Sequence, residues 1–278
     1  MAFLGDYHTH TQYSRSGGKL HGKSTVLDNA RAAAKIGLKE LAITDHGFGH
    51  VFGVKGAVAF DALKAECLAA SEETGVAVYA GLENNLDPKS GKRKDVPPLL
   101  NLDETTLGKL EIVQGGYHAY IGTPRMFPNM LFWTRNSVFG WLPHKKLMAH
   151  NTEAYIRLID EYPIDFIGHI GRGIVADVVE VARYAHSKGV YIELNGRHKT
   201  LDVKQIKLMA ESGVEFICNS DAHNASDVGR MTLGEELIKA SGISYESIAN
   251  WDRLPEFRSR NFRDARTSRS AGGERGDD

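Results

Sequence analysis

The sequence predicts a single α/β domain built as a closed β/α barrel. Seven short runs of apolar, often β-branched residues have the character of strands, and helix-like stretches separate most of them. A strand followed by a helix, repeated about seven times, is typical of a parallel sheet. The length of 278 residues is ordinary for one such barrel and is enough to bury a sizeable core. We therefore expect one folded domain over residues 1–262.

Each expected strand is a short apolar run bounded by turn residues. The seven runs cover residues 2–7, 40–44, 76–82, 110–114, 166–168, 190–194 and 215–219. The first expected helix is capped by Ser24 or Thr25 and runs through Ala34 to a stop at Gly37. Later helix-like stretches cover residues 57–73, 152–161, 175–188, 203–212 and 233–240. Glycines at positions 75, 189 and 213 follow three of these stretches, as expected for C-terminal stops.

The charge balance and the cysteine content indicate which binding partners and which cellular compartment to expect for the protein. The 34 Lys and Arg residues balance 35 Asp and Glu residues, and the net charge of −1 gives no general electrostatic case for nucleic acid or an anionic membrane. The N-terminal residues lack a basic region and a long apolar core, and no uninterrupted apolar run reaches about 18 residues. We therefore expect a cytoplasmic protein without membrane contact. Cys67 and Cys218 are expected to be buried, reduced thiols. The sequence does not indicate an oligomeric state.

Two segments depart from the alternation of strands and helices. Residues 89–98 are polar and charged, which predicts an exposed loop. From residue 263 the chain lacks large apolar side chains, and we expect a disordered tail over residues 263–278.

Histidine or carboxylate side chains follow six of the seven expected strands. His8 and His10 follow the first strand, and residues two apart in an extended chain point to the same side, so both imidazoles can reach one ion. Asp221 and His223 repeat this spacing after the last strand. The other candidates at or near strand ends are His21, His46, Glu83, His118 and His169. In a closed barrel every strand delivers its last residue to the same face, so these side chains predict a shared metal site.

A lone histidine near the end of a strand is most often an ordinary polar residue. Here seven of the 12 histidines lie at, or within a loop of, the same strand ends, and this coincidence favours metal binding. Asp45, beside His46, is a candidate for a carboxylate that orients an imidazole. The remaining histidines do not fit the pattern as ligands: His50, His144, His150, His186 and His198.

In their order along the chain, the motifs HTHT, ITDHG, GLE, GGYH, GH and SDAH resemble those of the PHP (polymerase and histidinol phosphatase) superfamily of metal-dependent phosphoesterases. The match spans residues 6–223. The resemblance implies a distorted (β/α)7 barrel with a trinuclear site at the C-terminal ends of its strands. It also implies the ligands of each ion. The first ion would be held by His8, His10, Glu83 and Asp221. Glu83 would bridge to the second, held by His118 and His169, and the third would take His21, His46 and His223.

The chemistry of this ligand set limits the metal and the substrate. Seven neutral imidazoles and two carboxylates carry about −2 against roughly +6 from three divalent ions, and the excess of positive charge suits an anionic phosphate ester. Nitrogen-rich ligation favours Zn²⁺, Mn²⁺ or Fe²⁺ over Mg²⁺ and Ca²⁺. We therefore expect two to three divalent transition-metal ions.

The sixth expected strand ends without a ligand, and the residues after it are candidates for contacting a substrate. These are Asn195, Arg197 and His198, and Arg172 joins them because guanidinium groups match phosphate oxygens. Arginines that pair with surface acids are an equally good interpretation for each. Arg125 is a weaker candidate. The aromatic segment 126–143 forms either a lid or buried packing.

These features together predict a hydrolase of phosphate esters in which a metal-bound hydroxide attacks phosphorus. No side chain, Ser220 included, is assigned as a nucleophile. Small phosphomonoesters such as histidinol phosphate or sugar phosphates are the leading substrates, and nucleotides or DNA 3′ ends are alternatives. The lack of basic excess disfavours long nucleic acid. The alternative from a different class is a non-catalytic metal-binding regulatory module.

Overall fold

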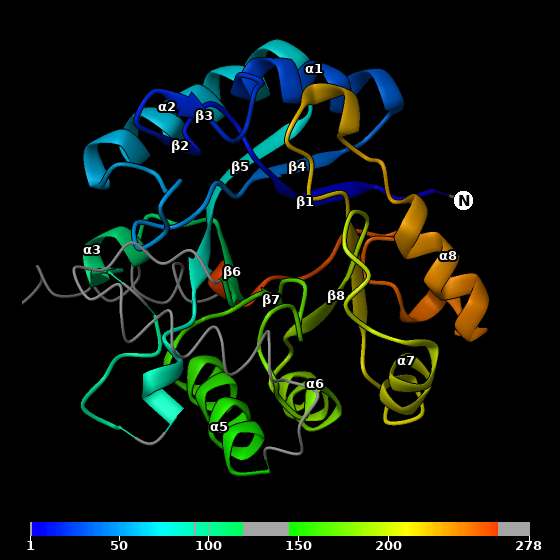
Figure 1. Ribbon diagram of the computed structural model, residues 1–278. Helices are drawn as coiled ribbons and strands as arrows, with labels where there is room; N and C mark the ends of the chain where they lie inside the picture. The colour runs from blue at the N-terminus through cyan, green and yellow to red at the C-terminus, as the bar shows by residue number, and fades with distance from the viewer. Residues whose placement is uncertain (1, 92, 100, 119–144, 261–278) are drawn as a thin grey trace, which may run out of the picture.

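A computed structural model of the chain describes residues 2–91, 93–99, 101–118 and 145–260. Within these residues seven strands form one curled sheet in the order β1-β4-β5-β6-β7-β8-β9, with helices around its outside (Figure 1). The strands are β1 (Gly5–Thr9), β4 (Glu40–Ile43), β5 (Ala77–Asn85), β6 (Ile112–Gly116), β7 (Phe166–Ile167), β8 (Tyr191–Asn195) and β9 (Phe216–Asn219). Every neighbouring pair is parallel, which confirms the predicted (β/α)7 barrel.

Most helices begin and end close to the positions expected from the sequence, but the short helix Glu104–Leu107 was not expected, and the helix Lys145–Glu161 begins well before the expected start at Thr152. The helices are α1 (Val26–Ile36), α2 (Ala57–Thr74), α3 (Glu104–Leu107), α5 (Lys145–Glu161), α6 (Val178–Ser187), α7 (Val203–Ala210) and α8 (Thr232–Ser241), with short 3-10 turns η1 (Pro88–Gly91), η3 (Ala225–Asp227) and η4 (Tyr245–Ser247). Thr25 caps α1 in a capping box with Asp28, and Gly37 ends it in the left-handed conformation at φ 85°. The choice left open between Ser24 and Thr25 is thus decided for Thr25.

The barrel is closed between β1 and β9 by a mixture of backbone and side-chain hydrogen bonds. Near the C-terminal ends of the two strands, the amide of His10 donates to the carbonyl of Ala222 at 2.8 Å. Nearer the N-terminal ends of the two strands, the side chain of Asn250 links β1 and β9 by hydrogen bonds to the backbone of both. Its Nδ2 donates to the carbonyls of Gly5 (2.8 Å) and Cys218 (2.6 Å), while its Oδ1 accepts from the amide of Cys218 (3.1 Å). The barrel is distorted at this point, because a side chain and not direct backbone pairing joins the two strands.

The barrel interior has an apolar layer below a polar layer, because interior positions alternate along each strand. Tyr7, Ala42, Ile112, Phe166, Ile217 and Phe257 form the buried apolar cluster. Two residues further along β6 and β8, the interior side chains are Gln114 and Glu193, both fully buried. In β1 the register shifts by one residue between Asp6 and Thr9, so Tyr7 joins the apolar layer while His8 also faces inward among the polar side chains.

Several expected boundaries were wrong in detail. The strand expected at residues 2–7 begins at Gly5 and continues to Thr9, and β5 extends to Asn85, so Glu83 lies inside the strand. A two-stranded hairpin of β2 (Arg15–Ser16) and β3 (Lys19–Leu20) was not predicted. The loop expected to be exposed at residues 89–98 begins in η1, where Ser90 is buried and its carbonyl accepts a hydrogen bond from Arg157.

Other expectations fall partly or wholly outside the described residues. Arg125, His144, the aromatic segment 126–143 and the tail 263–278 lie outside them, and the domain boundary at residue 262 stays a prediction. Cys67 and Cys218 are buried free thiols, and burial raises the pKa of both. Across the described residues, every helix is too short or too polar to cross a bilayer.

Candidate metal centre

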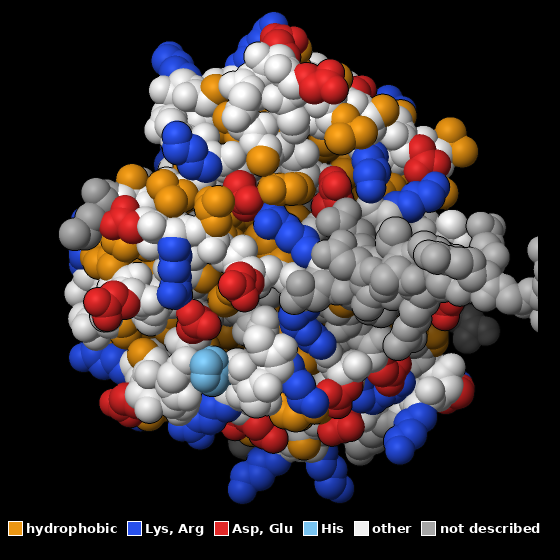
Figure 2. Space-filling view, turned by 180° about the vertical axis from the view of Figure 1, so that it is seen from behind, with side chains coloured by type: hydrophobic (Ala, Val, Ile, Leu, Met, Phe, Trp, Pro, Cys, Tyr) orange, Lys and Arg blue, Asp and Glu red, His pale blue; other side chains and the backbone are white. Residues whose placement is uncertain are grey.

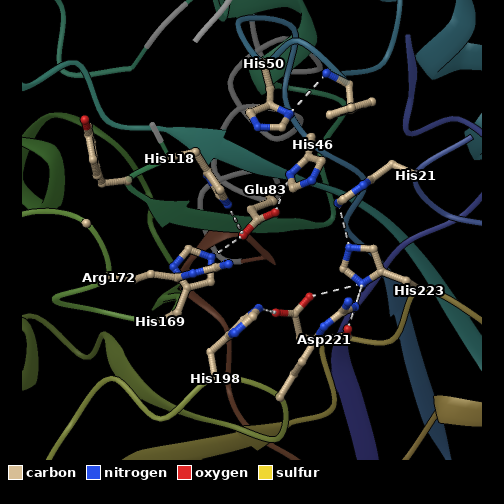
Figure 3. Close-up of a pocket in the computed structure, with 14 residues that line it drawn as sticks. His21, His46, His50, Glu83, His118, His169, Arg172, His198, Asp221 and His223 are labelled. Atoms are coloured by element: carbon tan, nitrogen blue, oxygen red, sulfur yellow. Dashed lines mark hydrogen bonds and ion pairs between the residues drawn. The ribbon is translucent and has the colours of Figure 1, made fainter. Parts of the chain in front are cut away.

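All nine predicted ligands converge at the C-terminal ends of the barrel strands. A cavity of about 320 Å³ opens above them, and Figure 3 shows Glu83 at its centre with imidazoles directed toward it. Seven of the nine line this cavity: His21, His46, Glu83, His118, His169, Asp221 and His223. His8 and His10 lie beneath it and are fully buried. As expected, side chains that are far apart in the sequence lie together at the C-terminal face of the barrel.

Glu83 is the centre of the cluster, because both oxygens of its carboxylate face imidazole nitrogens. Around Oε1 lie Nε2 of His169 (2.6 Å), His118 (3.1 Å) and His8 (3.2 Å). Around Oε2 lie Nδ1 of His46 (2.6 Å) and Nε2 of His10 (3.6 Å). Glu83 is thus placed to share its two oxygens between neighbouring ions.

Asp221 anchors a second part of the cluster. Its Oδ1 lies 3.4 Å from Nε2 of His10 and 3.7 Å from Nε2 of His8. Beside it, Nε2 of His223 and Nε2 of His21 face each other at 2.9 Å. Four overlapping groups have ligand atoms all within 4.8 Å of one another: His8–His10–Asp221, His8–Glu83–His169, His46–Glu83–His118 and His10–His46–His223.

The four groups of the structure can be compared with the ion assignment that the family resemblance implied. His8, His10 and Asp221 form a group, as expected for the first ion, and Glu83 lies between His169 and His118. His46 was assigned only to the third ion, together with His21 and His223. In the structure it also approaches Glu83, whereas His21 belongs to none of the four groups of the described residues and meets the cluster only through His223.

The donor atoms fit a divalent transition metal, because several are buried without a hydrogen-bond partner. Both ring nitrogens of His10 and of His46, and Oε2 of Glu83, have none within the described part of the chain. Leaving such a buried group unpaired costs about 1–3 kcal/mol. An ion held between nitrogen and carboxylate ligands would satisfy Oε2 of Glu83 and one nitrogen of each ring, since a neutral imidazole offers one lone pair, and the predominance of imidazole suits zinc, manganese or iron.

Neighbouring groups fix which nitrogen of two imidazoles is available to an ion. Oδ1 of Asn85 lies 2.7 Å from Nδ1 of His118, and Oε1 of Glu193 lies 2.8 Å from Nδ1 of His8. Because these oxygens accept hydrogen bonds, each Nδ1 carries a proton and each Nε2 is the ring atom left to bind an ion.

Burial sets the protonation of the cluster in the metal-free protein. It lowers the pKa of His10 to about 3 and that of His223 to about 3, so both rings are neutral at neutral pH. For Glu83 and Asp221 burial acts to raise the pKa, but the surrounding imidazoles outweigh it and hold both values well below the usual range. These four side chains are therefore in the forms that bind metal, whereas His8 must lose a proton first, because the carboxylates of Glu193, Asp221 and Glu83 outweigh burial and raise its pKa well above the usual value.

Two predicted ligands have strained backbones. His169 has φ 30° and Asp221 has φ 54°, both in the left-handed region that favours glycine. Such a conformation costs on the order of 1–3 kcal/mol and persists only where surrounding contacts enforce it. Strain of this kind concentrates at functional sites, which agrees with the position of both residues at the cavity.

Three of the four residues predicted to contact the substrate lie at the cavity, and the fourth is buried. Arg172, Arg197 and His198 line the cavity. Neither guanidinium forms an ion pair with a carboxylate of the described residues, and Nη1 of Arg197 lies 2.5 Å from Nδ1 of His223. Asn195 does not fit its predicted role: it is buried, and its amide is used by the protein itself, donating to Glu193 and accepting from the backbone amides of Arg197 and His198.

Asp45 does not have the role expected for it. It is fully buried, and the hydrogen bonds of its carboxylate come from Thr11 and Ser14, without an imidazole among its partners in the described residues. Ser14 in turn accepts from the backbone amide of His46 at 3.2 Å. Asp45 therefore shapes the loops that carry His46 and does not touch its ring.

Sequence reasoning missed two residues of the site. Glu193 was passed over because it lies inside an apolar strand, although an ionisable residue in such a position is itself a signal of function. His50 was set aside as a ligand, yet it is buried, and its ring lies 4.0 Å from that of His46. Nδ1 of His50 accepts a hydrogen bond from the amide of Phe52, so Nε2 carries the proton. His50 therefore faces the cavity as a hydrogen-bond donor.

Comparisons with known proteins agree with this geometry. The model of the PHP domain family matches residues 6–197. A probable phosphatase of Thermoanaerobacter sp. (strain X514) is 30% identical over 261 residues, which cover 91% of this chain and 92% of the relative. A probable phosphatase of Clostridium botulinum (strain Langeland) is 27% identical over 259 residues, 90% of this chain and 91% of the relative.

Among solved structures, the fold is similar to that of a histidinol phosphate phosphatase from Lactococcus lactis in complex with zinc, L-histidinol and phosphate. The TM-score is 0.56 at 16% identity, and the alignment covers 93% of this chain and 98% of the other. At this identity the similarity concerns the fold alone.

Proposed function

Because this chain belongs to the PHP domain family, we propose that it is a metal-dependent phosphoesterase that hydrolyses small phosphomonoesters at a trinuclear site. The observation that carries the proposal is the arrangement of nine ligand side chains around Glu83, beside two arginines that lack a carboxylate partner in the described residues. The relatives named as probable phosphatases support the reaction class. The structural neighbour is in complex with L-histidinol and phosphate, which are the two parts of a small phosphomonoester, and with zinc, one of the metals proposed here.

The ligands are proposed to divide among three ions. The first would be held by His8, His10, Glu83 and Asp221, and the second by Glu83, His118 and His169. The third would be held by His21, His46 and His223. The short distances from Glu83 to His169 and His118 support its bridging role. When bound, the ions supply the activated water that attacks phosphorus and the positive charge that stabilises the leaving alkoxide.

The chain itself binds and orients the phosphate. Arg172 and Arg197 lie at the cavity wall, where their guanidinium groups can donate charge-assisted hydrogen bonds to phosphate oxygens that point away from the ions. His198, also in the wall, adds a further polar contact, and its pKa is lowered to about 4, first by burial and then by the charge of Arg172. It is therefore a neutral group at neutral pH. No protein nucleophile is required.

The size of the cavity and the surface charge favour a small substrate. A volume of about 320 Å³ is at the small end for ligand pockets, which commonly measure roughly 300–1,000 Å³. On the face shown in Figure 2, which is opposite to that of Figure 1, positive and negative side chains are intermixed. The chain as a whole has a net charge of −1, whereas a strand of nucleic acid usually binds along a basic stripe. Small phosphomonoesters are therefore favoured over DNA 3′ ends as the proposed substrates.

A substrate screen tests this proposal. The metal-supplemented protein should hydrolyse para-nitrophenyl phosphate and members of a panel of phosphorylated metabolites, and a chelator should abolish the activity. Bis-para-nitrophenyl phosphate and 3′-phosphorylated oligonucleotides serve as comparison substrates. Faster hydrolysis of the diester would replace the phosphomonoester by a nuclease function, and faster release of phosphate from the oligonucleotides would identify DNA 3′ ends as the preferred substrate. Metal binding without hydrolysis of any ester would favour the non-catalytic module.

A further inference from the structure

Glu193 in β8 is a fully buried carboxylate that contacts two of the proposed ligands. Its Oε1 lies 2.8 Å from Nδ1 of His8, and its Oε2 accepts a hydrogen bond from the backbone amide of His169 at 2.8 Å. Two side-chain amides complete its surroundings: Asn219 donates to Oε1 at 3.1 Å, and Asn195 donates to Oε2 at 2.9 Å. With two donors on each oxygen, the carboxylate has a single orientation.

The contact with His8 determines the direction of its imidazole. A carboxylate can only accept, so Nδ1 of His8 carries the proton. Nε2 is then the ring atom left to bind an ion, and it lies 3.2 Å from Oε1 of Glu83 and 3.7 Å from Oδ1 of Asp221. These are the two carboxylates proposed to share the first ion with His8.

The contact with His169 acts on the backbone. His169 has φ 30°, a conformation that a residue with a side chain rarely adopts unless other contacts hold it. Oε2 of Glu193 accepts the amide hydrogen of this residue, and the ring then places Nε2 at 2.6 Å from Oε1 of Glu83. Without that acceptor the amide would be buried and unpaired, and a relaxed backbone would carry the ring away from Glu83.

We propose that Glu193 is a positioning residue that fixes a ligand of the first ion and a ligand of the second ion at the same time. The inference rests on the proposed metal-dependent function. It goes beyond the ligand set, because Glu193 itself touches neither the ions nor the substrate. A single side chain would then couple the geometry of the two ions, since a shift of its carboxylate moves His8 and His169 together.

Glu193→Gln tests the role while preserving the shape of the side chain. One carboxylate oxygen becomes an amino group, which must face either His8 and Asn219 or His169 and Asn195, all of them donors. We expect the affinity of the full-length variant for Zn²⁺, measured by competition with a chromophoric chelator, to fall about 10- to 100-fold for at least one ion, as is typical when a partner of a metal ligand is removed.

Asp165→Asn is the matched control. Asp165 is also fully buried, and its carboxylate accepts hydrogen bonds from the amides of Val113 and Ser259. The same isosteric change there should lower the stability toward urea but leave the Zn²⁺ affinity within about twofold, because distant sites act independently. A loss of affinity in Asp165→Asn equal to that in Glu193→Gln would overturn the proposal, since destabilisation alone would then explain both.

Unchanged Zn²⁺ affinity in Glu193→Gln would also overturn it. If that variant does not fold, the tautomer of His8 in the zinc-loaded wild-type protein decides instead. Long-range ¹⁵N–¹H correlation should show a proton on Nδ1 and none on Nε2, and a proton on Nε2 of the zinc-loaded protein would contradict the proposal. A wild-type protein that binds Zn²⁺ but hydrolyses no phosphate ester would contradict the proposed function and leave the role of Glu193 intact. A wild-type protein that binds no metal would overturn both.

Discussion

Nδ1 of His46 lies 2.6 Å from Oε2 of Glu83, and both atoms are buried. A buried imidazole nitrogen and a carboxylate oxygen at this distance can both donate a lone pair to a common ion. We therefore expect the purified protein to carry two to three transition-metal ions per chain, in line with its nine convergent ligands. Elemental analysis measures this directly. A content below one ion per chain after metal-supplemented purification would contradict it.

His8→Ala and Asp221→Ala should each abolish phosphatase activity and lower the metal content while the barrel stays folded. The two residues lie at the open end of the barrel, above the apolar layer that holds the strands together. Turnover and elemental analysis of each variant, with circular dichroism for the fold, provide the check. Cys67→Ser is the control and should keep the wild-type metal content, because its buried thiol lies outside the ligand groups. Near wild-type turnover in either ligand variant would show that the ligand assignment is wrong.

Arg172→Ala and Arg197→Ala should lower kcat/KM about tenfold to a hundredfold, since a charge-assisted hydrogen bond to phosphate contributes roughly 1.5–3 kcal/mol. Their metal content should not change, because neither residue is a ligand. Arg183→Ala is the control: this residue lies in α6 on the outside of the barrel, where its Nε donates to Ser212. Full activity of both variants on every hydrolysed ester would mean that other residues bind the phosphate.

The metal-free protein should lose stability as the pH falls below about 6.5. Buried His10 and His223 titrate at about 3 in the folded chain but at about 6.5 when unfolded, so the unfolded state binds more protons in between. Each such histidine lowers the free energy of unfolding by about 1.4 kcal/mol per pH unit in this window. The stability that the neutral rings contribute is present above pH 6.5 and is lost on acidification.

Other groups modify this slope without reversing it. The pKa of buried Asp45 and that of buried Asp165 are raised to about 6, which acts in the opposite direction between their unfolded and folded values. Burial raises the pKa of Asp6 as well, and the carboxylates around His8 outweigh burial and raise its pKa, so these two groups also oppose the slope. Burial lowers the pKa of His21, His46, His50, His118 and His198, so with His10 and His223 the histidines of lowered pKa outnumber the four opposing groups. Urea unfolding in the presence of a chelator, from about pH 7.5 to about pH 5.5, measures the effect. A free energy that stays constant or rises on acidification would disprove it.

Asn250→Ala should destabilise the protein by about 3–5 kcal/mol, because it leaves the carbonyls of Gly5 and Cys218 and the amide of Cys218 buried without their partner. Urea unfolding of the metal-loaded protein measures the change. Asn224→Ala is the matched control, since this half-buried amide donates only to neighbouring Asp227 at 3.3 Å. We expect it to stay within about 0.5 kcal/mol of wild type. Equal stability of the two variants would mean that Asn250 does not close the barrel.

The sequence by itself determined the alternation of parallel strands with helices and the candidate ligands at the strand ends. Period-two spacing in His8-Thr9-His10 and the apolar runs before His46, His118 and His169 place these side chains at strand ends, and parallel strands end at one face. These features depend on local patterns, and local patterns are visible in the order of the residues. The helix cap at Thr25 and the stop at Gly37 were predictable for the same reason.

Only the tertiary structure decided which side chains meet. Glu193 and His8 are 185 residues apart in the chain, and no local pattern records that their side chains share a hydrogen bond. The one-residue shift in β1 that turns both Tyr7 and His8 inward arises from pairing with β4. The tertiary structure also decided the role of Asn195. Its side-chain amide donates a hydrogen bond to Glu193 and is therefore not available to a substrate. Such contacts depend on how the barrel closes, and closure is a property of the whole chain.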